Sequence, residues 1–179
     1  MDVIKELYSR IENVNLWDGS VLLKRNEFLK DAGAIDNNLY YILSGSLKMS
    51  IINKNKENII RLGYKNNFMA SLDSFITGKP SDFCIQAIRK TKLKFISKES
   101  HSKLINQNAE TQLLWSKILE QLVLQQIERE KDIFITSPKE RFKKVLERSP
   151  NLFQEVPAKY IASYLRMTPE TLSRLRSLD

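Results

Sequence analysis

The sequence predicts an α+β protein in three parts, because its hydrophobic periodicity changes twice along the chain. Short runs of β-branched and aromatic residues fill the stretch from Val21 to Ser97, and one long helical pattern follows from Asn108 to Lys131. The last part contains capped helices. The predicted domains are therefore 1–107, 108–136 and 137–179. With 179 residues, 42% of them hydrophobic and only 5 Gly and 5 Pro, the chain is expected to be largely ordered around a packed core.

The first part is expected to form a β-sandwich or barrel with a helix against it. LYYILSGSLKMSIIN and IIRLGY are separated by NKNKEN, which predicts a hairpin with a loop of about four to five residues, and FCIQAI and LKFIS predict further strands. Residues 2–13 are predicted to form the helix. The apolar residues of its helical stripe are Val3, Ile4, Leu7, Ile11 and Val14.

The long central helix is apolar over a wide arc. Two lines of large residues run along it at a spacing of four, and one domain of this size can easily cover only one side. We therefore predict a dimer interface; the alternative is a fully buried core helix in a monomer. The predicted interface residues are Leu114, Trp115, Ile118, Leu119 and Leu122.

The last part begins with a predicted capping box. Ser137 is expected to cap a helix in which Pro138 occupies the first position and Glu140 reaches back, and Ser149-Pro150 ends that helix. A second helix is predicted to start near Pro157. A third is expected to be capped by Thr168, with a proline at its first position.

These last two helices have the spacing of a helix-turn-helix. The small residue required where the helices cross is Ala162, and the place in the turn that favours a left-handed backbone is Arg166, at a cost of about 1 kcal/mol. An ordinary helical hairpin is the alternative. The apolar positions expected to be buried are Ile161, Leu165, Met167, Leu172 and Leu175.

Charge and composition narrow the possible functions. The net charge is +8, and residues 137–179 hold nine Lys and Arg against five Asp and Glu, which is compatible with nucleic acid binding or with an ordinary basic surface. Cys84 is the one cysteine and His101 the one histidine, so disulfides, cysteine-rich metal sites and a Ser-His-Asp triad are not expected. We expect Cys84 to be buried and His101 to be a surface or capping residue.

The sequence also predicts several features that the protein lacks. The charged, amphipathic N-terminus does not resemble a secretory signal, so the protein is expected to be soluble and cytoplasmic, with no membrane partner. No nucleophile with a base and no acid–base pair can be located. We therefore expect no enzymatic activity, no metal and no cofactor.

The whole pattern resembles the cyclic-AMP receptor protein and fumarate-nitrate regulator (Crp/Fnr) family of bacterial transcription factors. NEFLKDAGAIDNNLYYILSGSLKMSI resembles the family's Leu-x-x-x-Gly and Tyr-x-x-x-x-Gly signature, and MTPETLSRLR resembles its recognition helix, in a form similar to regulators from the Bacteroidetes. The resemblance implies a jelly-roll sensor domain (a double-stranded β-helix), a homodimer and promoter DNA as partner. It also implies a small-molecule effector and RNA polymerase as further partners.

The effector site departs from the family pattern. In cyclic-nucleotide binders, Phe-x-Gly-Glu supplies an amide and a ribose-binding carboxylate, and an Arg-Ser pair binds the cyclic phosphate. Here Ala70 and Ser71 stand for the Gly and Glu, while Ser81 and Asp82 stand for the Arg and Ser. Without the guanidinium, the strongest anchor for a phosphate is missing. The resemblance therefore implies a degenerate site, and cyclic-nucleotide sensing is not expected.

The predicted recognition helix runs from Pro169 to about Ser177. Glu170 can accept from the cytosine amino group, and Arg174 can donate to guanine or phosphate, whereas the remaining candidates position the helix on the DNA backbone. An alternative role for Glu170 is to stabilise the helix dipole. The printed sequence ends at Asp179, where the family often continues into a wing, so weaker anchoring is expected. The candidate DNA-binding residues are Lys159, Thr168, Pro169, Glu170, Ser173, Arg174 and Arg176.

The predicted function is that of a homodimeric DNA-binding regulator whose effector is unknown. Two alternatives remain: a β-roll regulatory module that has lost sequence-specific DNA binding, and a small-molecule-binding protein with a vestigial helical tail.

Overall fold

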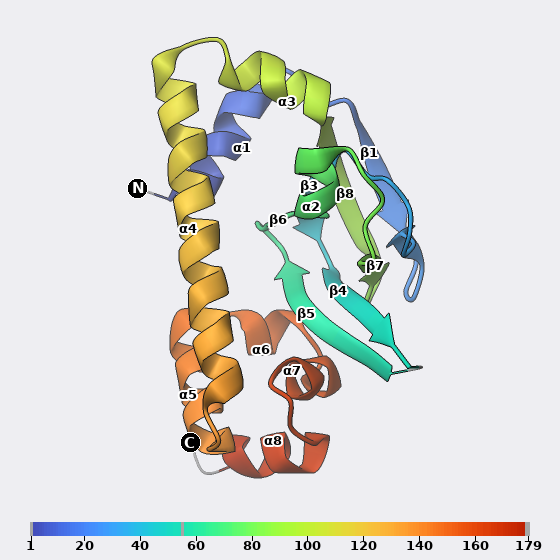
Figure 1. Cartoon of the computed structure of the whole chain (residues 1–179), viewed down its shortest axis with the longest axis vertical. Coiled ribbons are helices and arrows are strands. Elements are labelled where there is room, and N and C mark those ends of the chain that lie inside the picture. Colours follow the sequence, from blue (N-terminus) through green and yellow to red (C-terminus); the bar gives the residue numbers. More distant parts are fainter. Residues whose placement is uncertain (1, 55, 178–179) are drawn as a thin grey trace.

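The computed structural model describes residues 2–54 and 56–177 and orders the elements as one β-rich unit, one long helix and a group of short helices (Figure 1). The N-terminal elements are α1 (Val3–Asn13), β1 (Gly19–Leu23), β2 (Phe28–Lys30), β3 (Asn38–Ser44), β4 (Ser46–Asn53), β5 (Lys56–Tyr64), β6 (Phe68–Met69), α2 (Leu72–Thr77), β7 (Cys84–Ala87), β8 (Thr91–Ser97) and α3 (Lys98–Ile105). The remaining elements are α4 (Ala109–Phe134), α5 (Pro138–Arg148), α6 (Leu152–Glu155), α7 (Ala158–Tyr164) and α8 (Pro169–Arg176).

The strands form two four-stranded antiparallel sheets, in the orders β1-β8-β3-β6 and β2-β7-β4-β5. Apolar residues of both sheets meet in one core, including Ile42 and Leu93 from the first sheet and Leu47 and Ile85 from the second. Two sheets packed face to face around such a core confirm the predicted β-roll.

Gly45 marks the point where the chain passes from one sheet to the other. Its φ of +88° lies in the left-handed region, and a Cβ there would lie 2.4 Å from the carbonyl oxygen of Lys90. Only glycine meets both conditions without strain. The single run LYYILSGSLKMSIIN therefore becomes two strands, β3 and β4.

The predicted hairpin is present with a shorter loop than expected. Asn53 pairs with Lys56, so β4 and β5 extend into the NKNKEN segment, and residue 55 lies outside the described residues. Lys54 adopts a φ of +48°, which allows the tight reversal. The prediction of a four- to five-residue loop was wrong because the pairing of the strands continues into polar residues.

The long helix α4 lies beside the β-roll and packs on α1 (Figure 1). The two helices share one apolar core with the neighbouring part of the chain. Its members include Leu7 and Ile11 of α1, Leu114 and Ile118 of α4, Leu39 of β3, Ile96 of β8, Phe75 of α2 and Leu104 of α3. Asp2 caps α1 as its side chain accepts from the amide of Ile4. The predicted N-terminal helix and long helix are thus both confirmed, and their apolar faces meet.

The C-terminal helices α5–α8 have their own core, and this core reaches into the β-roll. Phe142, Val145, Leu152 and Ile161 are buried together with Ile88 of the roll, and Leu62 and Tyr64 of β5 pack against them. The predicted boundaries near 107 and 136 fall between helices. The division into separate domains remains a prediction, because both helical parts share apolar contacts with the roll.

Two global features follow from the described residues. Among them, no helix combines the length and apolar character needed to cross a membrane. The same part of the chain holds no group of three or more His, Cys, Asp or Glu side chains placed to bind a metal.

Candidate functional site

The turn between α7 and α8 adopts the backbone that its sequence pattern predicted. Arg166 has a φ of +55°, and the amide of Met167 donates to the carbonyl of Ala162 at 3.0 Å. Arg141 of α5 reaches this turn, where its Nε donates to the carbonyl of Leu165 at 3.0 Å. Sequence reasoning missed Arg141, since its separation in the chain from the turn gives no local signal.

The buried positions of α7 and α8 follow the predicted spacing. Ile161, Ala162, Leu165 and Leu172 are completely buried, whereas Met167 and Leu175 are half-buried at the edge of the same core. Ala162 of α7 and Leu172 of α8 belong to one buried cluster, and the two helices are in contact. This packing leaves the opposite side of α8 free.

The caps also form as expected, with one difference. Thr168 accepts from the amide of Thr171 at 3.2 Å, and Pro169 is the first residue of α8. Ser137 accepts from the amide of Glu140 at 3.3 Å. The reciprocal bond from the Glu140 side chain does not form among the described residues, so only half of the predicted capping box is present.

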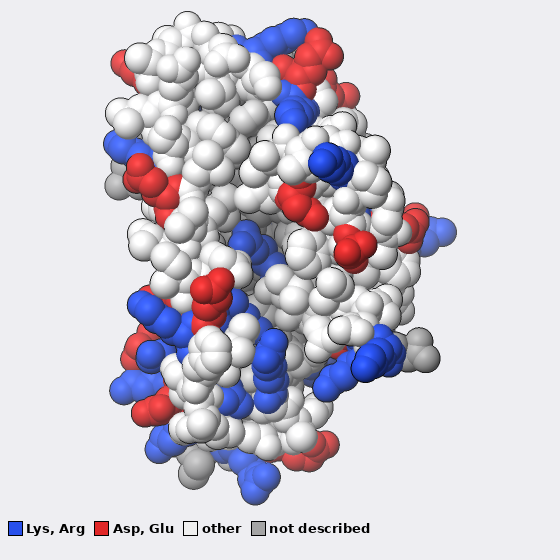
Figure 2. All heavy atoms as spheres, viewed as in Figure 1, with Lys and Arg blue, Asp and Glu red and all other residues white. Residues whose placement is uncertain are grey.

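Every residue proposed for DNA contact is exposed, whether on α8, at its N-cap or on α7. Thr168, Pro169, Glu170, Ser173, Arg174 and Arg176 are exposed, as is Lys159 on α7. Figure 2 shows Lys and Arg side chains gathered over the lower part of the molecule, where the C-terminal helices lie. The pKa of Glu170 is lowered because its carboxylate accepts from its own backbone amide and from Thr168 at the positive helix end.

The basic groups on this side lie over aromatic rings. The Lys159 ammonium lies 4.7 Å from the ring centroid of Tyr160, and the Arg176 guanidinium lies 5.6 Å from that of Phe153. Neither group, nor Arg174, forms an ion pair with a described carboxylate. All three cations are therefore available to an external anion.

The four residues predicted to form a degenerate effector site, which are Ala70, Ser71, Ser81 and Asp82, lie in different environments. Ser71 and Ser81 are buried, and their hydroxyls hydrogen-bond directly at 2.9 Å. Ser71 also donates to the Asp73 carboxylate at 3.2 Å. Asp82 is exposed, while Ala70 lines a cavity between the β-roll, α4 and the C-terminal helices. The two buried serine hydroxyls thus form one hydrogen-bonded cluster with Asp73.

The position of His101 differs from the prediction. It is 5% exposed and lies between the rings of Phe75 and Trp115, with centroid distances of 5.4 and 4.3 Å. Burial lowers its pKa to about 4. The prediction of a surface or capping histidine was wrong, because His101 shares the buried face of α3 with Leu104 and Ile105. Cys84 is buried as predicted and contacts the Ser50 hydroxyl at 3.2 Å.

The predicted dimer residues lie mostly on the inner side of α4. Leu114 and Ile118 are each 4% exposed in the chain's own core, and Trp115 and Leu122 pack against that core. For Leu114 and Ile118 the prediction was wrong, because α1 and the β-roll already cover them. Leu119 is half-buried. Leu113, Val123, Leu124 and Ile127 are 41–62% exposed, and Phe134 at the end of the helix is 83% exposed.

Comparison with known proteins matches the β-roll to a sequence family. Residues 20–108 match the family described as "Cyclic nucleotide-binding domain". This span includes all eight strands apart from the first residue of β1, and it ends just before α4. No curated protein sequence matches the chain.

Solved structures share the fold along nearly the whole chain. FixK2 from Bradyrhizobium japonicum is 15% identical with a TM-score of 0.74, covering 89% of this chain and 82% of its own. The c-di-GMP-responsive global regulator CLP from Xanthomonas campestris is 15% identical with a TM-score of 0.68, covering 95% and 90%. The catabolite activator protein of Thermus thermophilus is 16% identical with a TM-score of 0.58, covering 97% and 82%. The β-roll is therefore a domain of the cyclic nucleotide-binding type, within a chain that has the overall fold of Crp/Fnr-type regulators.

Proposed function

We propose that this protein is a homodimeric DNA-binding transcription regulator whose effector is not a cyclic nucleotide. The observation that carries this proposal is the pair α7–α8. Its core side has the steric pattern of a helix-turn-helix, and its outer side exposes Glu170, Ser173 and Arg174 in the first two turns of α8. The early residues of such a recognition helix enter the major groove.

The surrounding charge supports contact with the DNA backbone. Lys159 and Arg176 are exposed without a described carboxylate partner, so they can neutralise phosphates on either side of the groove. Arg174 has the fork geometry that suits guanine. In this proposal Arg174 and Glu170 read bases, and the other exposed groups orient the helix.

The uncovered stripe of α4 supports the dimer. Leu113, Val123, Leu124 and Ile127 are 56%, 57%, 62% and 41% exposed, and they recur at helical spacing along one helix. An exposed apolar stripe of this length is typical of a helix that meets another helix. A second copy of α4 provides the matching apolar stripe, as a two-fold dimer requires.

Binding to genomic DNA fragments tests the DNA part of the proposal. A gel shift at two salt concentrations should show retained complexes whose affinity falls as salt rises, because phosphate contacts release counterions. The absence of any shifted complex at low salt would overturn DNA binding.

Sedimentation tests the dimer part. The wild-type chain should sediment as a dimer, and the double variant Val123→Glu, Leu124→Glu should sediment as a monomer. Leu22→Glu is a matched control, since Leu22 is 60% exposed on β1, away from α4, and this variant should remain dimeric. A wild-type monomer at micromolar concentration would contradict the dimer.

A further inference from the structure

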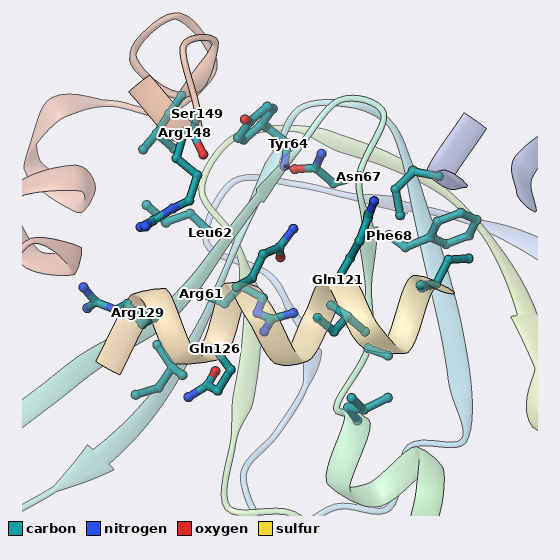
Figure 3. Close-up of a pocket in the computed structure, with 18 of the residues that line it drawn as sticks. Arg61, Leu62, Tyr64, Asn67, Phe68, Gln121, Gln126, Arg129, Arg148 and Ser149 are labelled. Carbon is teal, nitrogen blue, oxygen red and sulfur yellow. Dashed lines mark hydrogen bonds between the residues drawn. The ribbon is translucent and has the colours of Figure 1, made fainter. Parts of the chain in front are cut away.

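A cavity of about 360 Å³ lies at the junction of the β-roll, α4 and the C-terminal helices. Its walls come from β5, from the inner side of α4 and from the end of α5, as Figure 3 shows. Figure 2 shows basic side chains inside a hollow between α4 and the strands. A cavity of this volume is in the range that proteins use for small molecules.

Three arginines line this cavity, and no carboxylate does. Arg61 comes from β5, Arg129 from α4 and Arg148 from α5. Behind the lining, Asp132 is completely buried and pairs with Arg148 at 2.5 Å. The three lining guanidinium groups and the one carboxylate paired with them carry a net charge of +2.

Arg61 is the group that most requires a ligand. Among the described residues, its guanidinium forms no hydrogen bond and no ion pair, although burial is sufficient to lower its pKa. Arginine remains charged in proteins, and a desolvated charge without a partner is costly. By contrast, Arg129 donates to the carbonyl of Tyr164 and lies 3.9 Å from the centre of that ring.

The strand that carries Arg61 is irregular at this point. Arg61 pairs with Met49 and Ile59 pairs with Ser50, so Ile60 is an extra residue on β5. Such bulges change the direction of neighbouring side chains and are common beside functional sites. In Figure 3, Arg61 extends from β5 toward α4.

The rest of the lining suits an organic body attached to the charge. Apolar walls are provided by Leu62, Phe68, Trp115, Ile118 and Leu122, while amide groups are provided by Asn67, Gln121, Gln125 and Gln126. Of the four predicted effector positions, only Ala70 lines this cavity, whereas Ser71, Ser81 and Asp82 do not.

We propose that the junction cavity binds a small organic dianion, a phosphate monoester or a dicarboxylate, whose charge is held by Arg61 and Arg129. Two negative charges balance the +2 of the lining, and a phosphate monoester carries about −1.5 to −2 at neutral pH. The apolar walls hold a ring or short carbon chain. Because the walls come from both the β-roll and the C-terminal helices, one ligand contacts both parts of the chain.

Calorimetric titration of the full chain tests this proposal, with phenyl phosphate and phthalate as the two probes. At least one should bind at one site per chain with a Kd below about 1 mM. Methyl phenyl phosphate, a monoanion of similar shape, should bind more weakly. The comparison of phenyl phosphate with phthalate distinguishes a phosphate ligand from a dicarboxylate. No saturable binding of either dianion would overturn the proposal.

One substitution and a matched control test whether Arg61 binds the anion. Arg61→Gln should weaken binding by about 10- to 100-fold, since a hydrogen-bonded charge pair is lost. The same variant without ligand should melt at the same temperature as wild type or higher, because a half-buried charge without a partner has been removed. Arg25→Gln, on an exposed turn, is the matched control and should bind like wild type. Equal affinity of Arg61→Gln and wild type would contradict the site, whatever the outcome of DNA binding.

Discussion

The buried serine pair of the β-roll and the helix pair α7–α8 both lie in a fold shared with Crp/Fnr-type regulators, but their chemistry differs. At the first place, Ser71 and Ser81 hydrogen-bond to each other at 2.9 Å, with the Asp73 carboxylate 3.2 Å from the Ser71 hydroxyl. At the second, Ile161, Leu165 and Leu172 are completely buried, and Glu170 and Arg174 remain exposed.

The difference shows that fold and ligand chemistry depend on different residues. A β-roll needs its apolar core and its turns, and in this chain it forms with Ser71 and Ser81 buried together. A helix-turn-helix needs a few buried positions for its shape, and a separate outer side for DNA. The two regions can therefore be tested by separate substitutions.

The largest expected effect is on the core of the helix pair. Leu172→Ala should lower the free energy of unfolding by about 2–5 kcal/mol, because Leu172 is completely buried and its loss leaves a cavity. Denaturant unfolding measures the change. Its exposed neighbour provides the control: Ser173→Ala should change stability by less than about 0.5 kcal/mol. Similar losses for both variants would mean that α8 is not packed as described.

The free energy of unfolding should depend on pH through His101, which packs beside the β-roll. Burial holds the pKa of His101 at about 4, below its usual value near 6.5, so the unfolded chain binds this proton more readily. Its stabilising contribution is complete above pH 6.5 and is lost as pH falls toward 4, with a limit of about 3 kcal/mol. Unfolding measured at pH 7 and 5 should show this loss in wild type and a smaller loss in His101→Gln. An unchanged slope would contradict the burial of the ring.

A smaller effect is expected in the turn of the helix pair. Arg166 has a left-handed backbone that costs a non-glycine residue about 1–2 kcal/mol, and glycine offsets part of this gain through its freedom in the unfolded chain. Arg166→Gly should therefore raise stability by about 0.5–1 kcal/mol in thermal unfolding. A loss of stability would show that the Arg166 side chain makes a contact that outweighs the strain.

No effect is expected from cyclic nucleotides. Titration with cyclic AMP or cyclic GMP should reveal no binding tighter than about 1 mM, since the closed serine pair offers neither a ribose carboxylate nor a phosphate guanidinium. Micromolar affinity for either cyclic nucleotide would contradict the difference in chemistry between the serine pair and the helix pair α7–α8.

Local patterns predicted much of the fold. The positions of Ala162, Leu165 and Leu172 and the left-handed Arg166 were predicted because they depend on steric rules within twenty residues. The wide apolar arc of α4 was also evident. Which side of α4 the β-roll covers depends on packing between distant segments, and so Leu114 and Ile118 were assigned to the wrong side.

The candidate site also combines features that local sequence predicts with features that depend on contacts between distant segments. The degenerate positions were evident from the sequence, but the contact between Ser71 and Ser81 was not. Arg61 stands in a strand as an isolated charge, and nothing nearby in the sequence places it with Arg129 and Arg148 in one cavity. Sites assembled from three distant elements require the tertiary structure.

The central claim is that α8 reads DNA bases, and selection of bound sequences from a random pool tests it most directly. Wild-type protein should recover an inverted repeat with half-sites about 10–10.5 base pairs apart, as a two-fold dimer requires. Arg174→Ala should relax one position in each half-site at a cost of about 1–3 kcal/mol, whereas Lys159→Ala should weaken all sequences alike. Recovery of no inverted repeat, with equal losses for both variants, would contradict base reading and favour a β-roll module without sequence-specific DNA binding.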